Sequence, residues 1–297
     1  MATRAEAGFT ILPASQATLF SSIVRRENAP SLQRTDFVQN SNDSFWLTNP
    51  ASPITGVSPL FGATGTAQSL RSRLAQRFLE SGDAAAGADG KFTLDELEAV
   101  LFNHRTYLGE AVREDLLDRC QARGSTPVAG VDLSAACSAL AQWDGRMHKD
   151  RVGAFVFREF AEQFARLDEA QQWLTGFDPD APLDTPHTLS SSSAILEAFA
   201  AAVEKIEEAG LDIDATLGDV QFVERSTLAG TADGNRLAWS GANDIEGGFN
   251  VFAADEENDG TLLPRHIFPS PDDTQLSTAG YHVPYGSSWM YVLNFAA

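Results

Sequence analysis

The spacing of apolar residues changes along this 297-residue chain, and the change limits the folds that it can adopt. From residue 68 to about residue 210 apolar side chains recur every three or four positions, which predicts helices. After Gly210 the period falls to two, as in Val220–Arg225, which is typical of half-buried strands. The first sixty residues indicate irregular structure with brief strands. We therefore predict an α+β protein organised as 1–66, 67–210 and 211–297.

Six helices are expected in the middle stretch, and local signals mark several of their ends. Thr93 and Glu96 have the spacing of a capping box, and Gly124 and Gly210 follow predicted helix ends. The expected helices are one with Leu70, Leu74, Phe78 and Leu79 on its apolar face, one that starts after Thr93, 110–122, 132–143 with Asp132 as its cap, 151–167 with Phe155, Phe160 and Phe164 buried, and 193–209. Residues 175–193 are expected to form a loop, and the expected strands are 220–225, 248–252 and 287–295.

The charge of the chain excludes several classes of partner. It carries 21 basic and 41 acidic residues, a formal net charge of −20. Because such a field repels polyanions, we expect neither nucleic acid nor an anionic membrane surface as a partner. No apolar run is long enough to cross a bilayer. The first residues lack the basic and then apolar pattern of a signal peptide, which taken alone predicts a cytoplasmic chain.

The cysteines and histidines give little sign of a metal site, and we expect no metal and no cofactor. The five histidines never fall within ligand spacing of one another, and the calcium-loop-like segment Asp89–Glu96 lacks its leading oxygen ligands. Cys120 and Cys137 lie near the ends of two consecutive predicted helices. They would pair in an exported protein and would stay small buried apolar groups in the cytoplasm, so both states remain open.

Residues 36–50 contain an unusual concentration of Asn and Asp, with Asn40, Asn42 and Asn49 among them. Such side chains are costly to bury unless their amides and carboxylates form hydrogen bonds. Tight turns are one use of these groups. A second use is catalytic, because a neutral side-chain amide can donate to a developing oxyanion without titrating.

A family resemblance favours the second use. Val38–Pro50, followed by Pro53–Gly56 and Ser69–Arg73, closely resembles the penicillin acylase family, and more narrowly the branch of aculeacin and acyl-homoserine-lactone acylases. Thr93–Leu97 and Leu217–Arg225 resemble later parts of the same family, and the likeness extends in order over roughly residues 30 to 295.

The resemblance implies an N-terminal-nucleophile hydrolase, with part of an αββα core and a large helical section. Family members are exported precursors that cut themselves into an α-chain and a β-chain and act in the periplasm or outside the cell. A new N-terminal Ser then attacks an N-acyl amide, such as a β-lactam side chain, a homoserine lactone signal or a lipopeptide, with its own α-amino group as base.

By position in the motif, the oxyanion donor of the family corresponds most closely to Asn42. Asn40 is the runner-up, because two residues separated by one position on an extended segment share a face. An Arg twenty to thirty residues further on supports the surroundings of the nucleophile, and Arg71 or Arg73 fits that place.

The position of the motif differs from the family pattern, because only 41 residues precede Asn42. The sequence therefore predicts the C-terminal portion of a β-chain, without the nucleophile. Its expected partners are an α-chain, the N-terminal part of the β-chain and an N-acyl amide substrate. The alternative is a non-catalytic remnant or a helical binding module.

Overall fold

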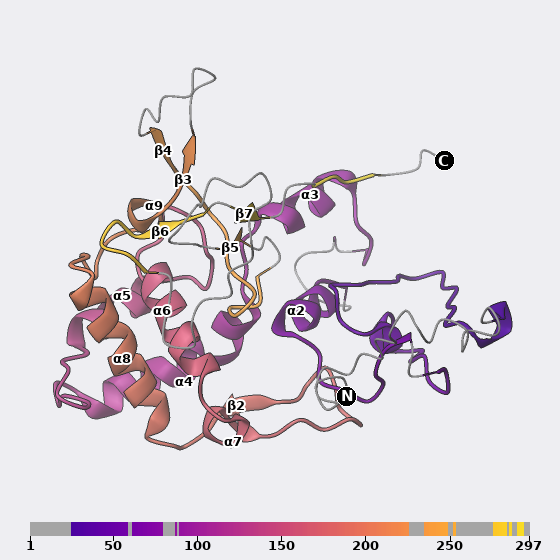
Figure 1. Cartoon of the computed structure of the whole chain (residues 1–297), viewed down its shortest axis with the longest axis horizontal. Helices are drawn as coiled ribbons and strands as arrows, with labels where there is room; N and C mark the ends of the chain where they lie inside the picture. The colour runs from indigo at the N-terminus through magenta and orange to yellow at the C-terminus, as the bar shows by residue number, and fades with distance from the viewer. Residues whose placement is uncertain are drawn as a thin grey trace, which may run out of the picture.

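Helices and small sheets combine in the computed structural model, which describes residues 25–58, 61–79, 87, 89–225, 235–248, 252–253, 276–283, 285–286 and 290–293. This mixture agrees with the α+β prediction (Figure 1). The helices are η2 Arg26–Asn28, η3 Phe45–Leu47, α2 Leu70–Leu79, α3 Leu94–Phe102, α4 Tyr107–Arg123, α5 Ser134–Gln142, α6 Ala154–Ala165, α7 Glu169–Gln172, α8 Ala194–Glu208 and α9 Leu217–Val220. The strands are β1 Trp173–Thr175, β2 His187–Leu189, β3 Gln221–Arg225, β4 Asn235–Ala238, β5 Phe252–Ala253, β6 Tyr281–His282 and β7 Tyr285–Gly286.

The main core forms where α6 packs against α8. Apolar residues occur all around α6, as expected of a helix that is buried on nearly every side. Phe160 of α6 meets Phe199 of α8 edge to face, with ring centroids 5.8 Å apart. Phe155 and Phe164 are also buried, which confirms the predicted face of this helix.

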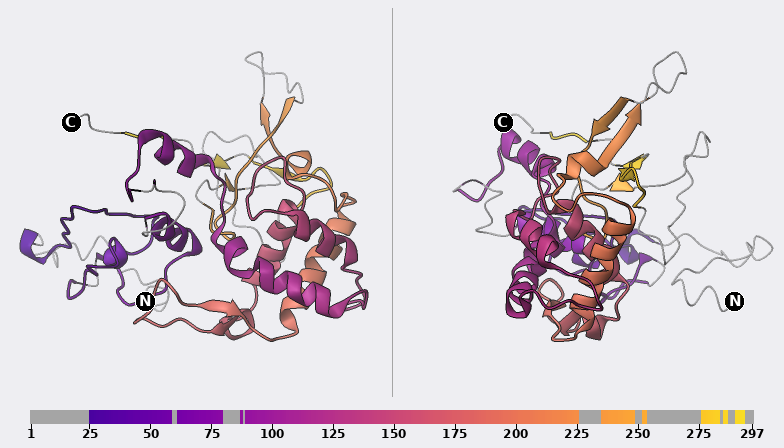
Figure 2. Two further views of the ribbon diagram at one scale, coloured as in Figure 1. Left: turned by 180° about the vertical axis from the view of Figure 1, so that it is seen from behind. Right: turned by 90° about the vertical axis from the view of Figure 1, so that its left-hand side faces the viewer.

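A smaller apolar cluster connects α2 to α3 and α4. It contains Leu74, Phe78, Val100 and Tyr107. In Figures 1 and 2, α2 and residues 25–58 lie on one side of the molecule, and α5, α6 and α8 lie on the other. The Asn-rich segment lies on the same side as α2, and the small cluster attaches that side to the helical core through α4.

Helix ends with local signals were predicted well. Thr93 and Glu96 form the expected capping box at α3, and Gly124 follows the end of α4. The N-cap residue of α5 is Leu133 and not Asp132, so this helix begins one residue later than predicted, although the Oδ1 atom of Asp132 accepts a hydrogen bond from Ser134 N at 2.9 Å. The open question of the cysteines is also answered, because Cys120 of α4 and Cys137 of α5 form a disulfide.

The strands were predicted less well. β3 confirms the strand at 220–225, and it lies between β4, which is antiparallel, and β6, which is parallel. β4 was not predicted, and the predicted loop 175–193 contains β2, which pairs antiparallel with β1. β2 has three residues and β4 has four, which is too short for an alternating apolar pattern to mark them as strands.

Two predicted strands fall partly outside the described residues. Of 248–252, the structure describes only Gly248, in an isolated bridge with Thr106, and Phe252, in β5. Of 287–295, only 290–293 are described; these four residues are in no strand, and Tyr291 and Leu293 are exposed. The prediction of a strand is therefore wrong for 290–293.

Residues 25–58 contain two short 3-10 helices, and this described part of the N-terminal stretch has none of the brief strands that we expected. The boundaries 1–66, 67–210 and 211–297 stay predictions. Within the described part of the chain, every helix is too short or too polar to cross a bilayer.

Candidate active site

Asn40 and Asn42 lie in a tight turn and not on an extended segment. The Oδ1 atom of Asn40 accepts a hydrogen bond from Asn42 N at 2.9 Å, and its Nδ2 atom donates to Asp43 O at 3.3 Å. Asn42 has a φ angle of +74°, in the left-handed region that Asn tolerates better than most residues. The expectation that the two amides share a face is therefore wrong, because the Asn40 side chain forms the hydrogen bonds that close the turn.

The first turn of α2 holds this turn in place. Asp43 Oδ2 accepts hydrogen bonds from Ser69 N at 2.9 Å and Ser69 Oγ at 2.7 Å. Ser69 Oγ accepts in turn from Ser72 N at 3.2 Å, as an N-cap residue does. The Asp43 carboxylate thus lies at the helix N-terminus, where the helix dipole favours a negative charge.

Arg71 of α2 contacts Asn42 directly. Its Nη2 atom donates to Asn42 Oδ1 at 2.9 Å. Because a guanidinium group only donates, this bond fixes the orientation of the Asn42 amide, with Oδ1 toward Arg71. Asn42 is exposed, and its Nδ2 atom makes no hydrogen bond to any residue that the structure describes. The amide therefore presents a donor to solvent.

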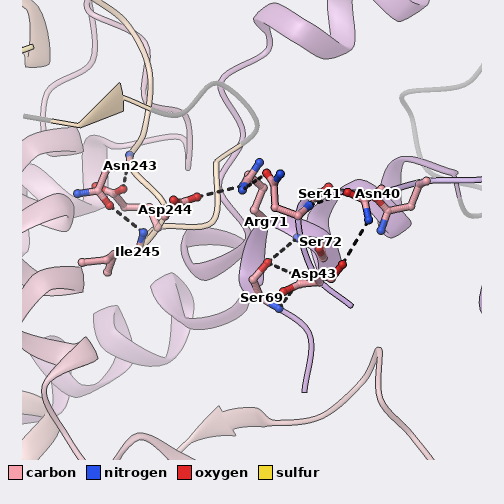
Figure 3. A network of polar contacts seen from close by, with 12 residues as sticks. Asn40, Ser41, Asp43, Ser69, Arg71, Ser72, Asn243, Asp244 and Ile245 are labelled. Carbon is pink, nitrogen blue, oxygen red and sulfur yellow. Dashed lines mark hydrogen bonds and ion pairs between the residues drawn. The ribbon is translucent and has the colours of Figure 1, made fainter. Parts of the chain in front are cut away.

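Asp244 is the second partner of Arg71, and it was not predicted from the sequence. Arg71 Nε lies 3.0 Å from Asp244 Oδ1, and Figure 3 shows Arg71 between Asp244 and the Asn40–Asp43 turn. Asp244 lies in a loop far along the chain, between β4 and β5. No spacing or motif connects it to Arg71 in the sequence.

Arg73 lies in a different environment. Its side chain is buried, with Nε donating to Leu183 O at 3.0 Å and Nη1 donating to Pro186 O at 2.9 Å. Its guanidinium group also lies over the Tyr107 ring, 4.4 Å from the centroid. Of the two candidate arginines, the structure thus brings Arg71 against Asn42 and uses Arg73 to hold the loop that ends at Pro186.

Asn49 has a structural role, because its side chain forms hydrogen bonds that close local turns. It is fully buried, donates from Nδ2 to Phe37 O at 2.9 Å and accepts from Ala51 N at 3.0 Å. Asn49 also contacts Asp36, whose pKa lies well below its usual range, chiefly because Arg34 donates to the carboxylate at 2.8 and 2.7 Å. These contacts stabilise the segment that leads into the turn.

Among the described residues, no group of three or more His, Cys, Asp and Glu side chains is arranged to hold a metal ion. The arrangement around Asn42 instead offers a neutral hydrogen-bond donor of fixed orientation. Such a donor can stabilise negative charge that develops on a carbonyl oxygen.

The family model for penicillin amidase matches residues 1–297, and the chain belongs to this family. Among curated proteins, it is similar to an acyl-homoserine lactone acylase PvdQ of Pseudomonas syringae pv. syringae, with 35% identity over 70% of this chain and 26% of the relative. It is also 36% identical to the aculeacin-A acylase of Actinoplanes utahensis, over 52% of this chain and 19% of that protein. A PvdQ acylase of Pseudomonas fluorescens matches at 32% identity over 78% of this chain and 28% of its own length.

These matches place the chain in the branch that the motif suggested, and the relatives are acylases. The chain spans about a quarter of the length of the curated relatives that it matches.

Proposed function

We propose that this chain forms part of an N-terminal-nucleophile amidohydrolase and supplies the side-chain donor of its oxyanion hole, Asn42. The observation that carries the proposal is the Arg71–Asn42 hydrogen bond of 2.9 Å, which leaves the Asn42 Nδ2 group exposed and oriented. Membership of the penicillin amidase family and the names of the relatives support an N-acyl amide as the substrate class.

In the proposed reaction, the N-terminal nucleophile lies outside this chain and attacks the amide carbonyl carbon. The pair of electrons of the C=O double bond moves to oxygen, and Asn42 Nδ2–H donates to that oxyanion. The tetrahedral intermediate collapses and expels the amine, which takes up the proton that the nucleophile gave to its own α-amino group during attack. An acyl-enzyme remains. Water then attacks the acyl group, releases the carboxylic acid and restores the nucleophile.

We further propose that the chain works with an α-chain and with the N-terminal part of a β-chain, in the periplasm or outside the cell. The disulfide between Cys120 and Cys137 supports an oxidising compartment, because disulfides persist there and are rare in the cytosol. The names of the relatives favour an acyl-homoserine lactone or a compound similar to aculeacin A as the substrate.

The test is hydrolysis of N-acyl homoserine lactones by an acylase that contains this chain, assembled with the α-chain and the N-terminal β-chain part. Asn42→Ala should lower turnover by roughly two to three orders of magnitude, as loss of an oxyanion donor does. Asn42→Asp is the second variant, because it keeps a residue that tolerates a positive φ angle but removes the amide donor. It should lose a similar factor.

Asn28→Ala, an exposed position in η2, is the matched control and should leave turnover unchanged. Equal turnover in wild type and both Asn42 variants would contradict the oxyanion assignment. Absence of hydrolysis in the assembled wild type would instead favour a non-catalytic chain.

A further inference from the structure

Arg71 uses two different nitrogen atoms of its guanidinium group to contact two distant parts of the chain. Nη2 donates to Asn42 Oδ1 at 2.9 Å, and Nε lies 3.0 Å from Asp244 Oδ1. Because the guanidinium group is planar and rigid, fixing Nε also fixes the direction in which Nη2 points. The Asp244 carboxylate attracts this end of the guanidinium group by its charge, because Nε makes no hydrogen bond to any residue that the structure describes.

Asp244 itself lies in a turn that its neighbours close tightly. Asn243 N donates to Glu246 Oε2 at 2.6 Å, and Ile245 N donates to Asn243 Oδ1 at 2.8 Å. The side chain of Asn243 reaches into the core and donates to Glu162 Oε1 of α6 at 2.9 Å. The turn is thus fixed internally and also attached to the buried helix α6.

Glu246 attaches the same turn to a second point in the core. Its carboxylate is fully buried, with Oε1 3.9 Å from Arg158 Nε of α6. Arg158 is held in turn by a hydrogen bond to Gln221 of β3 and by the Tyr281 ring, whose centroid lies 4.0 Å from the guanidinium carbon. The position of Asp244 therefore depends on α6, β3 and β6.

The loop also touches the start of α4 and the start of α2. Tyr107 N donates to Gly247 O at 3.3 Å, and Leu108 N donates to Glu246 O at 3.1 Å, so loop carbonyls satisfy N–H groups at the α4 N-terminus. Gly247 has a φ angle of +70°, and a Cβ atom there would lie 2.5 Å from Leu70 Cβ. Only glycine lets the loop approach α2 this closely, next to Arg71.

We propose that Asp244 is a positioning residue of the acylase, which orients Arg71 and through it the donor amide of Asn42. This inference rests on the proposed function of Asn42. The contribution of the ion pair to stability is small, because the Asp244 side chain is 68% exposed and pairs of this kind contribute about 0–1 kcal/mol. Its contribution is instead to catalytic geometry.

The test is a kinetic comparison in the assembled acylase. Asp244→Asn keeps the shape of the side chain and removes its charge, and it should lower kcat roughly 10- to 100-fold, the range for a displaced catalytic group. KM should stay the same, because the proposal gives Asp244 a contact with Arg71 and none with the substrate, and the melting temperature should also stay the same. Asp244→Glu restores the charge and should recover part of the lost kcat.

A double-mutant cycle separates positioning from a merely structural role. If Asp244 acts through Asn42, Asp244→Asn should have no further effect on kcat in an Asn42→Ala background. An equal loss in both backgrounds would overturn the proposal, and so would an unchanged kcat in Asp244→Asn alone. If Asn42→Ala itself leaves kcat unchanged, the proposed oxyanion role is wrong, whereas a loss with Asn42→Ala and none with Asp244→Asn overturns only the role of Asp244.

A control and a second measurement do not depend on the oxyanion role. Asp144→Asn breaks a similar surface pair, Asp144 with Arg151 at 2.8 Å, and should leave kcat unchanged. In the chain by itself, the NMR signal of the Arg71 Nε–H group, assigned by its loss in Arg71→Lys, should shift in Asp244→Asn, because the carboxylate charge 3.0 Å from Nε is removed. An unchanged signal would show that the contact is absent in solution and would overturn the proposal.

Discussion

Single residues in this protein acquire their roles from distant neighbours, and Arg71 and Arg73 show this most clearly. Residues two positions apart on a helix point roughly 200° away from each other. Arg71 therefore reaches Asn42 and Asp244, while Arg73 reaches the carbonyl groups of Leu183 and Pro186. The sequence could limit the candidates to these two arginines, but it could not choose between them.

The two arginines should respond differently to the same conservative change. In the assembled acylase, Arg71→Lys should lower kcat roughly tenfold or more. The single ammonium group of Lys cannot contact Asn42 and Asp244 at once with the geometry of a planar guanidinium group. Its stability should change little. Arg73→Lys should instead lower the free energy of unfolding by about 2 kcal/mol, because buried carbonyl groups lose charged hydrogen bonds.

Urea unfolding and steady-state kinetics on both variants provide the check. A large loss of stability in Arg71→Lys with no change in Arg73→Lys would contradict the assignment of the two environments.

At the scale of elements, the prediction succeeded where the signal was local. The capping box of Thr93 and Glu96 and the glycine after α4 depend only on neighbours within a few residues. β2 and β4 were missed because short strands are defined by pairing across the chain, and β2 follows a loop rich in proline. The motif in residues 38–50 was found as a pattern, but its turn geometry depends on Ser69, directly before α2, and on Arg71 in α2.

The disulfide between α4 and α5 should contribute measurably to stability. Cys120 and Cys137 are separated by 17 positions, and cross-linking a loop of this length restricts the unfolded chain by about 3 kcal/mol. We expect reduction, or the double change of both cysteines to Ala, to lower the free energy of unfolding by about that amount. Urea unfolding with and without reductant measures the difference.

The control for this prediction is the double Ala variant, whose stability should not respond to reductant. A wild-type midpoint that is identical with and without reductant, together with two titratable thiols in the untreated protein, would contradict the pairing.

At the scale of the whole molecule, the candidate site is assembled from three parts of the chain. The turn at 40–43, the first turn of α2 and the loop around Asp244 meet only in the folded protein. Asn42 and Arg71 lie 29 positions apart, within one motif-bearing stretch, so a family pattern could suggest both. Asp244 could not be predicted, because its place depends on buried contacts with α6, β3 and α4.

Two buried groups should give the stability of the molecule opposing pH dependences. Burial, and secondarily the charge of Glu162, raises the pKa of Glu246 from 4.5 to about 7, against the opposing effect of Arg158. Burial, followed by His148 and Arg146, lowers the pKa of His104 from 6.5 to about 4.

The direction of each effect on stability depends on whether the folded or the unfolded chain binds the proton more tightly. Folded Glu246 holds its proton more tightly than the unfolded chain does, so its contribution is fully present below about pH 4.5 and is lost as the pH rises through about 7. Folded His104 holds its proton less tightly, so its contribution is fully present above about pH 6.5 and is lost as the pH falls through about 4. Between these values the two effects partly cancel in the wild type.

Glu246→Gln should reveal this cancellation, because it removes the titration and keeps an acceptor for Asn243 N. Relative to the wild type, its free energy of unfolding should rise between pH 4.5 and 7 by up to about 3 kcal/mol, which is the Glu246 pKa shift converted at about 1.4 kcal/mol per unit. His104→Asn, which tolerates the φ angle of +54° at that position, should gain relative to the wild type as the pH falls from 6.5 to 4. Urea unfolding at half-unit pH steps compares the three proteins, and variant curves that run parallel to the wild type would show that neither group titrates in this range.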